Sequence, residues 1–283
     1  MPIAEKELRI ALLIDADNAP ADKIDEILTE LSTLGVINVR RAYGNWTKSG
    51  LNGWEKKLHQ YAIRPIQQFD YSKRKNASDM AMTVDAMDLF YADRPDAFGI
   101  VSSDADFTPL VMHLRSKGAA VYGFGADQTP KPFVSACSRF LYLEALGSLD
   151  APVSLIEADS DGVGSASKAK RGAKSAGAAK PGEDPAPGVP GHPARLRATS
   201  AELRKDTALI NLLRDAANAS QDEDGWARVG AVGTQIANKT SFDARNYGYA
   251  TLTKLLAATQ AFDMRDEGTS QVAVRDKRGN RNG

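Results

Sequence analysis

A chain of 283 residues is long enough for about two domains, and a hydrophobic fraction of 42% is sufficient for packed cores. The formal net charge is zero, which excludes the long-range electrostatic attraction of a strong DNA binder, so any nucleic-acid contact must come from local basic patches. The sequence has neither the roughly 20 consecutive apolar residues that cross a membrane nor a signal peptide, and it has a single cysteine, Cys137; we therefore expect a cytoplasmic protein with no membrane partner.

Residues 1–150 alternate between strand and helix signals along the chain. Strands are predicted at 9–14, 36–43, 63–69, 98–102, 120–124 and 139–143, with helices at 21–34, 52–61, 77–91 and 107–117. This alternation predicts an α/β fold with a doubly wound, mainly parallel sheet. In the usual strand order of such a sheet, the first and fourth strands lie side by side.

Two pairs of aspartates directly follow the first and fourth predicted strands. Asp15 and Asp17 come after the apolar run ALLI, and Asp104 and Asp106 come after FGIVSS. Ligands bind at the carboxyl ends of strands in open α/β sheets, so the two pairs are expected to form one anionic pocket. Hard oxygen ligands without histidine or cysteine favour Mg²⁺ or Mn²⁺, and such sites commonly serve phosphate chemistry.

The third predicted helix adds a further carboxylate to this site. Asp79 lies in its first turn, where the helix dipole favours a negative charge. Asp85 follows six residues later, about 240° around the helix, so both cannot point at one metal ion and Asp85 is expected to play a supporting or surface role. The apolar side chains Met80, Val84, Met87 and Phe90 are predicted to pack in the core.

Three motifs together resemble one protein family: IDADN after the first strand, KNASD at the start of the third helix, and SSDADF after the fourth strand. Over residues 8–146 the chain resembles NYN domains, which have a PIN-like nuclease fold, and in particular their LabA-like bacterial branch. The resemblance implies a metal-dependent ribonuclease acting on RNA. It implies that Asp15, Asp79 and Asp104 are catalytic metal ligands, with Asp17, Asn18 and Asp106 in supporting roles. We further expect Asp106 to be a metal ligand and Asp85 and Ser103 to play supporting roles.

Two other functions remain open. The segment IDADNA also resembles haloacid dehalogenase phosphatases, in which Asp15 would be a covalent nucleophile and Asp17 a general acid; Ala19 stands where those enzymes have Thr or Val, and no cap domain is evident. Alternatively, the protein is a non-catalytic RNA-binding adaptor whose acids hold the loops. A trapped phosphate ester or aspartyl-phosphate would indicate the phosphatase, whereas RNA binding without metal-dependent turnover would indicate the adaptor.

Short groups of basic residues are the candidates for contacts with RNA phosphates. They are Lys73, Arg74 and Lys75, directly before the third helix, together with Lys48 and Arg41.

Residues 151–198 are rich in Gly, Ala, Ser, Lys and Pro, which predicts a disordered linker. Beyond it, helices are predicted at 201–218, 229–237 and 247–260, with a hairpin around Glu267–Ser270; this pattern favours a small winged helix-turn-helix domain over 199–283. The stretch from Trp226 to Phe262 resembles an OST-HTH, or LOTUS, domain. That resemblance implies a module that binds RNA or a protein partner.

Overall fold

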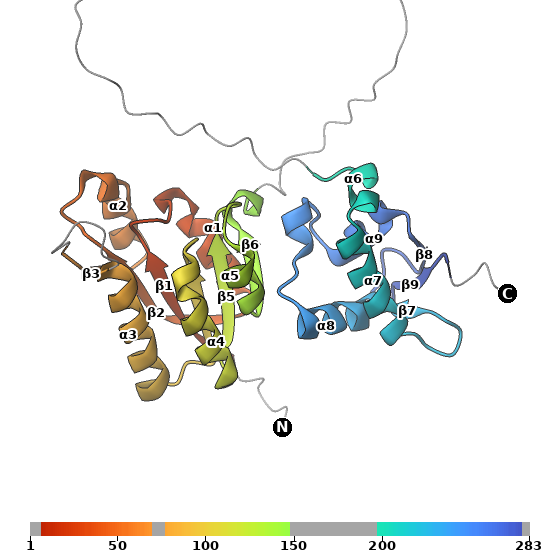
Figure 1. Ribbon diagram of the computed structural model, residues 1–283, viewed down its shortest axis with the longest axis horizontal. Coiled ribbons are helices and arrows are strands. Elements are labelled where there is room, and N and C mark those ends of the chain that lie inside the picture. Colours follow the sequence, from red (N-terminus) through yellow and green to blue (C-terminus); the bar gives the residue numbers. More distant parts are fainter. Residues whose placement is uncertain (1–6, 70–76, 148–196, 279–283) are drawn as a thin grey trace, which may run out of the picture. The chain divides into compact units, whose positions relative to one another are not determined.

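The computed structural model describes residues 7–69, 77–147 and 197–278. In the N-terminal domain six strands form one sheet in the order β3-β2-β1-β4-β5-β6, and all neighbouring strands are parallel (Figure 1). The predicted doubly wound α/β fold is therefore confirmed, with β1 and β4 adjacent. The strands are β1 (Leu8–Asp15), β2 (Gly35–Gly44), β3 (Arg64–Gln67), β4 (Ala97–Val101), β5 (Ala120–Gly125) and β6 (Arg139–Tyr142).

Helices cover both faces of this sheet, so the central strands are buried on both sides (Figure 1). Along β1, Ile10, Leu12 and Ile14 enter one core, whereas Ala11 and Leu13 enter the other, as expected from the two-residue period of a strand. The first face carries α1 (Ile24–Ser32) and α2 (Asn52–Gln60); the second carries α3 (Ala77–Ala92), α4 (Thr108–Ser116) and α5 (Lys131–Ala136).

The short helix α5 is absent from the sequence-based prediction. It begins after Pro130, whose extended backbone precedes the first turn, and it has only 6 residues. A helix of this length offers less than two turns of periodicity, so its apolar pattern is too short to recognise. Its buried Phe133 closes the second core beside β6.

The prediction that Met80 and Val84 pack in the core is wrong. Helix α3 turns a different face to the sheet, with Met82, Ala86 and Leu89 buried, and leaves Met80 and Val84 exposed. The helix has apolar side chains on both faces, so periodicity alone does not determine which face is buried. The other two members of the predicted set, Met87 and Phe90, are partly buried against the core.

The C-terminal domain combines helices with a three-stranded antiparallel sheet in the order β7-β9-β8 around its own core. The predicted helix at 201–218 is two helices, because Asp206 interrupts it and accepts a hydrogen bond from the backbone N–H of Leu209. Together the elements of this domain match a winged helix-turn-helix. They are α6 (Ser200–Lys205), α7 (Thr207–Ala219), β7 (Ala227–Arg228), α8 (Val229–Lys239), α9 (Leu252–Thr259), β8 (Phe262–Arg265) and β9 (Ala273–Asp276).

Except for residues 197 and 198, the predicted linker lies outside the described residues, and so does the basic segment Lys73, Arg74 and Lys75. Within the described ranges, no helix is both long enough and apolar enough to cross a membrane.

Candidate active site

Asp15 lies at the carboxyl end of β1, in the middle of the sheet, and only 1% of its surface is exposed. One carboxylate oxygen, Oδ2, accepts hydrogen bonds of 2.9 Å from the side chains of Asn18 and Ser102. The other, Oδ1, is buried and has no hydrogen-bond partner among the described residues. Burial raises the pKa of Asp15, against the lowering effect of these two hydrogen bonds. The site therefore holds a buried carboxylate with one oxygen available to a ligand.

Ser102 connects the ends of β1 and β4. Ile14 pairs with Val101 in the sheet, so Asp15 and Ser102 follow at the same level of the two strands. The Ser102 hydroxyl donates to Asp15 and accepts a hydrogen bond of 3.1 Å from the backbone N–H of Asp104. Sequence reasoning singled out the next serine, Ser103, and missed Ser102. The hydroxyl of Ser103 instead accepts a hydrogen bond of 2.8 Å from the backbone N–H of Ala126, after β5.

Asp104 caps the short 3-10 helix η3 (Ala105–Phe107) that follows β4. Its carboxylate accepts a hydrogen bond of 2.8 Å from the backbone N–H of Asp106. This turn reverses the chain at the strand end and holds Asp104 beside β1, while the side chain of Asp106 is exposed. The second aspartate pair is thus fixed by local backbone geometry.

Asp17 has two partners from distant parts of the chain. It accepts a hydrogen bond of 2.8 Å from the hydroxyl of Ser78 in the first turn of α3, and its other oxygen lies 3.3 Å from the ammonium group of Lys48. Ser78 therefore ties the start of α3 to the loop after β1. Through this contact the turn that carries Asp79 is brought to the strand ends.

Asp79 directly follows Ser78, whose hydrogen bond to Asp17 brings the start of α3 towards the other acids. The pKa of Asp79 is raised to about 6. Burial is the largest cause, and the negative charges of Asp15, Asp104, Asp106 and Asp17 add to it. The arrangement is an accumulation of negative charge at the carboxyl ends of β1 and β4.

The residues present have the right chemistry for a divalent cation, since all the side chains of the cluster offer hard oxygen donors and one buried oxygen lacks a partner. Among the described residues, however, no three acidic, histidine or cysteine side chains already stand in a geometry that would hold one metal ion together. Asp15 supplies the available buried oxygen. The charge of Asp104 raises the pKa of Asp15, and the charge of Asp15 raises the pKa of Asp79.

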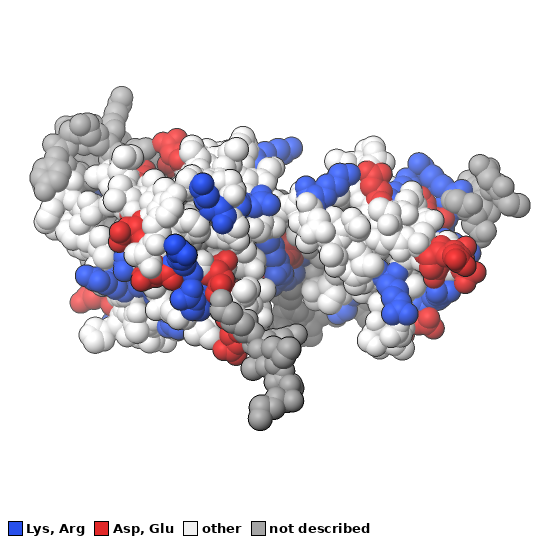
Figure 2. Space-filling view, turned by 90° about the horizontal axis from the view of Figure 1, so that it is seen from below, with Lys and Arg blue, Asp and Glu red and all other residues white. Residues whose placement is uncertain are grey.

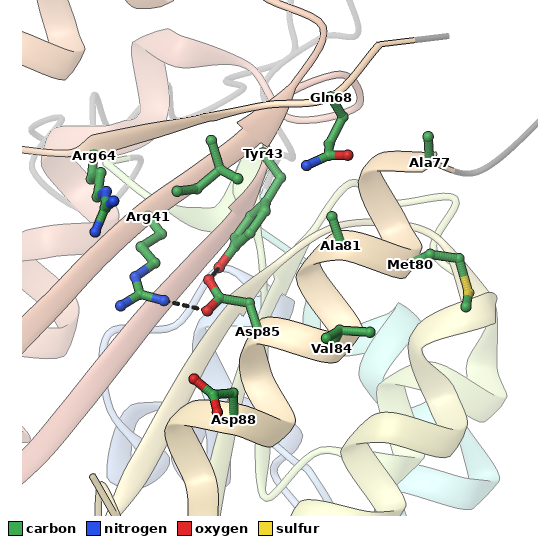
Figure 3. Close-up of a pocket in the computed structure, with 11 residues that line it drawn as sticks. Arg41, Tyr43, Arg64, Gln68, Ala77, Met80, Ala81, Val84, Asp85 and Asp88 are labelled. Atoms are coloured by element: carbon green, nitrogen blue, oxygen red, sulfur yellow. Dashed lines mark hydrogen bonds and ion pairs between the residues drawn. The ribbon is translucent and has the colours of Figure 1, made fainter. Parts of the chain in front are cut away.

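Asp85 does not join this cluster. Its carboxylate accepts hydrogen bonds from the guanidinium of Arg41 and the hydroxyl of Tyr43, at the end of β2 (Figure 3). Burial alone would lower the pKa of Arg41, but its hydrogen bond and ion pair with Asp85 raise that pKa; burial and the Asp85 carboxylate both raise the pKa of Tyr43. Asp85 therefore fixes α3 to β2.

A pocket of about 660 Å³ opens between α3 and strands β2 and β3 (Figure 3). We call it the α3 pocket. Its lining mixes apolar side chains with charges of both signs, which does not favour a strongly anionic ligand. The residues that line it are Arg41, Tyr43, Arg64, Ile66, Gln68, Ala77, Met80, Ala81, Val84, Asp85 and Asp88.

The described candidates for RNA contacts have partners within the protein. Arg41 is paired with Asp85, and Lys48 is paired with Asp17. Lys48 nevertheless lies beside the acidic cluster with its side chain 47% exposed, so it can exchange a carboxylate for a phosphate oxygen. Basic and acidic side chains are interspersed over the face seen in Figure 2.

The C-terminal domain has a hollow of about 570 Å³ beside the start of α6 and one side of α9, which we call the α9 hollow. The guanidinium of Arg197 stacks on Tyr249 at 4.3 Å from the ring centre, and Lys254 lies in the exposed first turn of α9. Tyr249 itself is buried in the core. Two cations beside hydroxyl groups form a surface that can contact phosphates. The hollow is lined by Arg197, Ala198, Thr199, Ser200, Tyr249, Lys254, Ala257 and Ala258.

Comparisons with known proteins agree with this architecture. The model of the NYN domain matches residues 9–144, and that of the OST-HTH/LOTUS domain matches residues 204–274. An uncharacterised protein of Methanocaldococcus jannaschii is 34% identical over 128 residues, which are 43% of this chain and 49% of that protein. The chain thus spans about half the length of this curated relative.

Two solved structures of uncharacterised bacterial proteins are similar to parts of the chain. One, a crystal structure from Vibrio parahaemolyticus, covers 50% of this chain and 95% of its own at 18% identity, with a TM-score of 0.40. The other, a solution structure from Nitrosomonas europaea, covers 34% of this chain and 92% of its own at 29% identity, with a TM-score of 0.22.

NYN domains have a nuclease-type fold, and OST-HTH domains bind RNA. The six-stranded parallel sheet flanked by helices, followed by a C-terminal domain rich in helices, agrees with these two matches. The chain carries an NYN domain over residues 9–144 and an OST-HTH/LOTUS domain over residues 204–274.

Proposed function

We propose that the N-terminal domain is a divalent-metal-dependent ribonuclease that uses Mg²⁺ or Mn²⁺, and that the C-terminal domain binds RNA or a protein partner. The nuclease-type fold of NYN domains supports the first part. The observation that carries the proposal is the buried Asp15 carboxylate, whose Oδ1 lacks a hydrogen-bond partner within the described residues while other acids surround it. Such an arrangement is unfavourable without a cation.

Asp15, Asp79, Asp104 and Asp106 are the residues proposed to hold the cation. When bound, a divalent ion lowers the pKa of a water molecule and neutralises charge on the phosphate oxygens. The protein orients these ligands through other side chains. Asn18 and Ser102 fix the Asp15 carboxylate, and the backbone N–H of Asp106 fixes that of Asp104.

Lys48 is proposed to act at the edge of the site. Its ammonium group lies 3.3 Å from Asp17 and remains partly exposed, so an RNA phosphate that enters beside Asp17 meets a positive charge there. The hydrogen bond from Ser78 to Asp17 keeps the loop after β1 attached to the start of α3. Asp17 thus positions the ammonium group of Lys48 for the substrate and is not required as a ligand of the metal ion.

The proposal is tested by incubating the purified protein with a mixed RNA pool in Mn²⁺, Mg²⁺ or EDTA and sequencing the product ends. We expect cleavage with either metal ion, none in EDTA, and none with Asp15→Asn. RNA binding without metal-dependent turnover would identify the adaptor instead. An acid-stable phosphate on Asp15 after incubation with a phosphate ester would identify the phosphatase.

A further inference from the structure

Helix α3 has a second apolar face that its own domain does not cover. Met80, Val84 and Tyr91 are 65%, 64% and 56% exposed, and Met87 lies between them in a partly buried position. At 100° per residue these four side chains fall within about 60° of one another around the helix. We call them the outer stripe. It lies opposite the buried face formed by Met82, Ala86 and Leu89.

Apolar surface continues beyond the outer stripe on both sides. Towards α4, the hydroxyl of Tyr91 lies 3.1 Å from the ring nitrogen of His113, and the neighbouring Met112 is exposed. Towards β3, Met80 and Val84 form one wall of the α3 pocket (Figure 3). Exposed apolar side chains grouped in this way are typical of a protein–protein contact. The absence of a basic residue among the four members of the stripe argues against RNA as the occupant.

The spacing of the outer stripe points to a second copy of the same chain. The intervals between its members are four, three and four residues, which is the spacing of apolar contact residues in paired helices. The order of these intervals is the same from either end of the helix. In an antiparallel pair related by a two-fold axis, Met80 therefore meets Tyr91 of the second copy, and Val84 meets Met87 of the second copy. A two-fold contact of this kind requires a surface that is complementary to itself.

The charges beside the outer stripe are also compatible with a two-fold contact. The α3 pocket has Arg64 on its β3 side, where the structure shows no ion pair to a described residue, and the exposed Asp88 on its α3 side. A surface that carries one cation and one anion next to an apolar ridge can pair with its own copy without accumulating charge of one sign.

We propose that the chain forms a homodimer through the outer stripe of α3, with the two helices antiparallel. Helix α3 has 16 residues and is about 24 Å long. The stripe alone is therefore smaller than the roughly 800 Å² per partner of a standard stable interface, and the flanking surfaces supply the rest. The dimer should be weak, with a dissociation constant on the order of micromolar.

Sedimentation equilibrium of the full chain, from about 2 to 200 µM, measures this association. We expect a concentration-dependent monomer–dimer equilibrium for the wild type, and a dissociation constant at least about 30-fold higher for Val84→Glu, because the change buries a charge in the contact. Val36→Glu is the matched control, since Val36 is also an exposed valine, 47% accessible, on β2. Circular dichroism establishes that both variants fold.

A monomeric wild type at every concentration would overturn the proposal, and so would a Val84→Glu variant that dimerises as well as the wild type. The antiparallel pairing has its own test. Val84→Cys combined with Met87→Cys should form a disulfide-linked dimer under mild oxidation, whereas Val84→Cys alone should not. The native Cys137 is buried and does not interfere. Efficient cross-linking through Val84→Cys alone would show a parallel pair and overturn the antiparallel arrangement.

Discussion

The hydroxyl of Ser102 donates a 2.9 Å hydrogen bond to the carboxylate of Asp15, across the boundary between the adjacent strands β1 and β4. The same hydroxyl accepts from the backbone N–H of Asp104, so one buried side chain fixes an acid from each of the two strand ends. The geometry of the acidic cluster therefore depends on the neutral side chain of Ser102, which is not itself among the proposed metal ligands.

Ser102→Ala should lower kcat about 10-fold and weaken the apparent affinity for Mn²⁺, while leaving the KM for RNA nearly unchanged. The hydrogen bond from Ser102 lowers the pKa of Asp15, and its loss makes the charged carboxylate harder to maintain. Steady-state kinetics with a short fluorescent RNA measure the effect. Ser103→Ala is the control, because that hydroxyl bonds to Ala126 and not to Asp15; equal losses in both variants would contradict the role given to Ser102.

Asp15→Asn should reduce cleavage by about 10³-fold or more, equivalent to about 4 kcal/mol of transition-state stabilisation. The variant should unfold at the same temperature as the wild type or above it in EDTA, because burial disfavours the charged form of Asp15 and asparagine carries no charge. Calorimetry and single-turnover cleavage measure the two effects. Asp85→Asn should retain most of the turnover, since Asp85 contacts Arg41 and Tyr43 instead. Wild-type cleavage by Asp15→Asn would refute the metal site.

The metal-free protein should become more stable as the pH falls from about 7 towards about 4. The pKa of Asp79 is raised to about 6 in the folded protein from an ordinary value of 3.8, so the folded state binds its proton more tightly than the unfolded state. This stabilisation is complete below the ordinary pKa and is lost as the pH rises through about 6. It should be on the order of 1 kcal/mol, because Asp79 is partly exposed and solvent screens its charge.

Urea unfolding in EDTA at several pH values tests this dependence on Asp79. The measured quantity is the difference in unfolding free energy between the wild type and Asp79→Asn, which cancels the other titrating groups. The difference should shift in favour of the wild type as the pH falls. A difference that does not change with pH would show that Asp79 is not held among charged carboxylates.

The products of cleavage should carry 5′-phosphate and 3′-hydroxyl ends. Direct attack of water on phosphorus leaves the ribose 2′-hydroxyl unused, so no cyclic phosphate forms. Ligation-based sequencing and mass spectrometry of the fragments distinguish the two outcomes. Recovery of 2′,3′-cyclic phosphate would instead show that the substrate's own hydroxyl is the nucleophile.

Reversing the charges of the α9 hollow, with Arg197→Glu and Lys254→Glu together, should weaken RNA binding by the full chain. The slope of the logarithm of the binding constant against the logarithm of the salt concentration should fall by the amount expected for the loss of about two phosphate contacts. Fluorescence anisotropy at several salt concentrations gives both quantities. A variant with Arg228→Glu and Lys239→Glu has the same net charge change at exposed positions of the same domain and outside the hollow. If both double variants lose affinity equally, the effect is one of overall charge and not of a site.

The sequence could predict the strands, most helices and the two aspartate pairs because these depend on local information. A buried strand such as β1 shows as an unbroken apolar run, and the acids that follow it must lie at a strand end. The adjacency of β1 and β4 followed from the usual strand order of parallel sheets. Features without a complete local pattern were missed, such as α5, which is too short, and the break at Asp206, which is a single capping residue.

The amino-acid sequence by itself determined the α/β fold and the carboxylates that end its strands, because side-chain periodicity and turn chemistry act over a few residues. Only the tertiary structure decided which partners those residues found. The register of β1 against β4 selected Ser102 over Ser103, and the rotation of α3 directed Asp85 to Arg41. The same rotation left Met80 and Val84 exposed, because a helix with apolar side chains on two faces can bury only the face that the sheet covers.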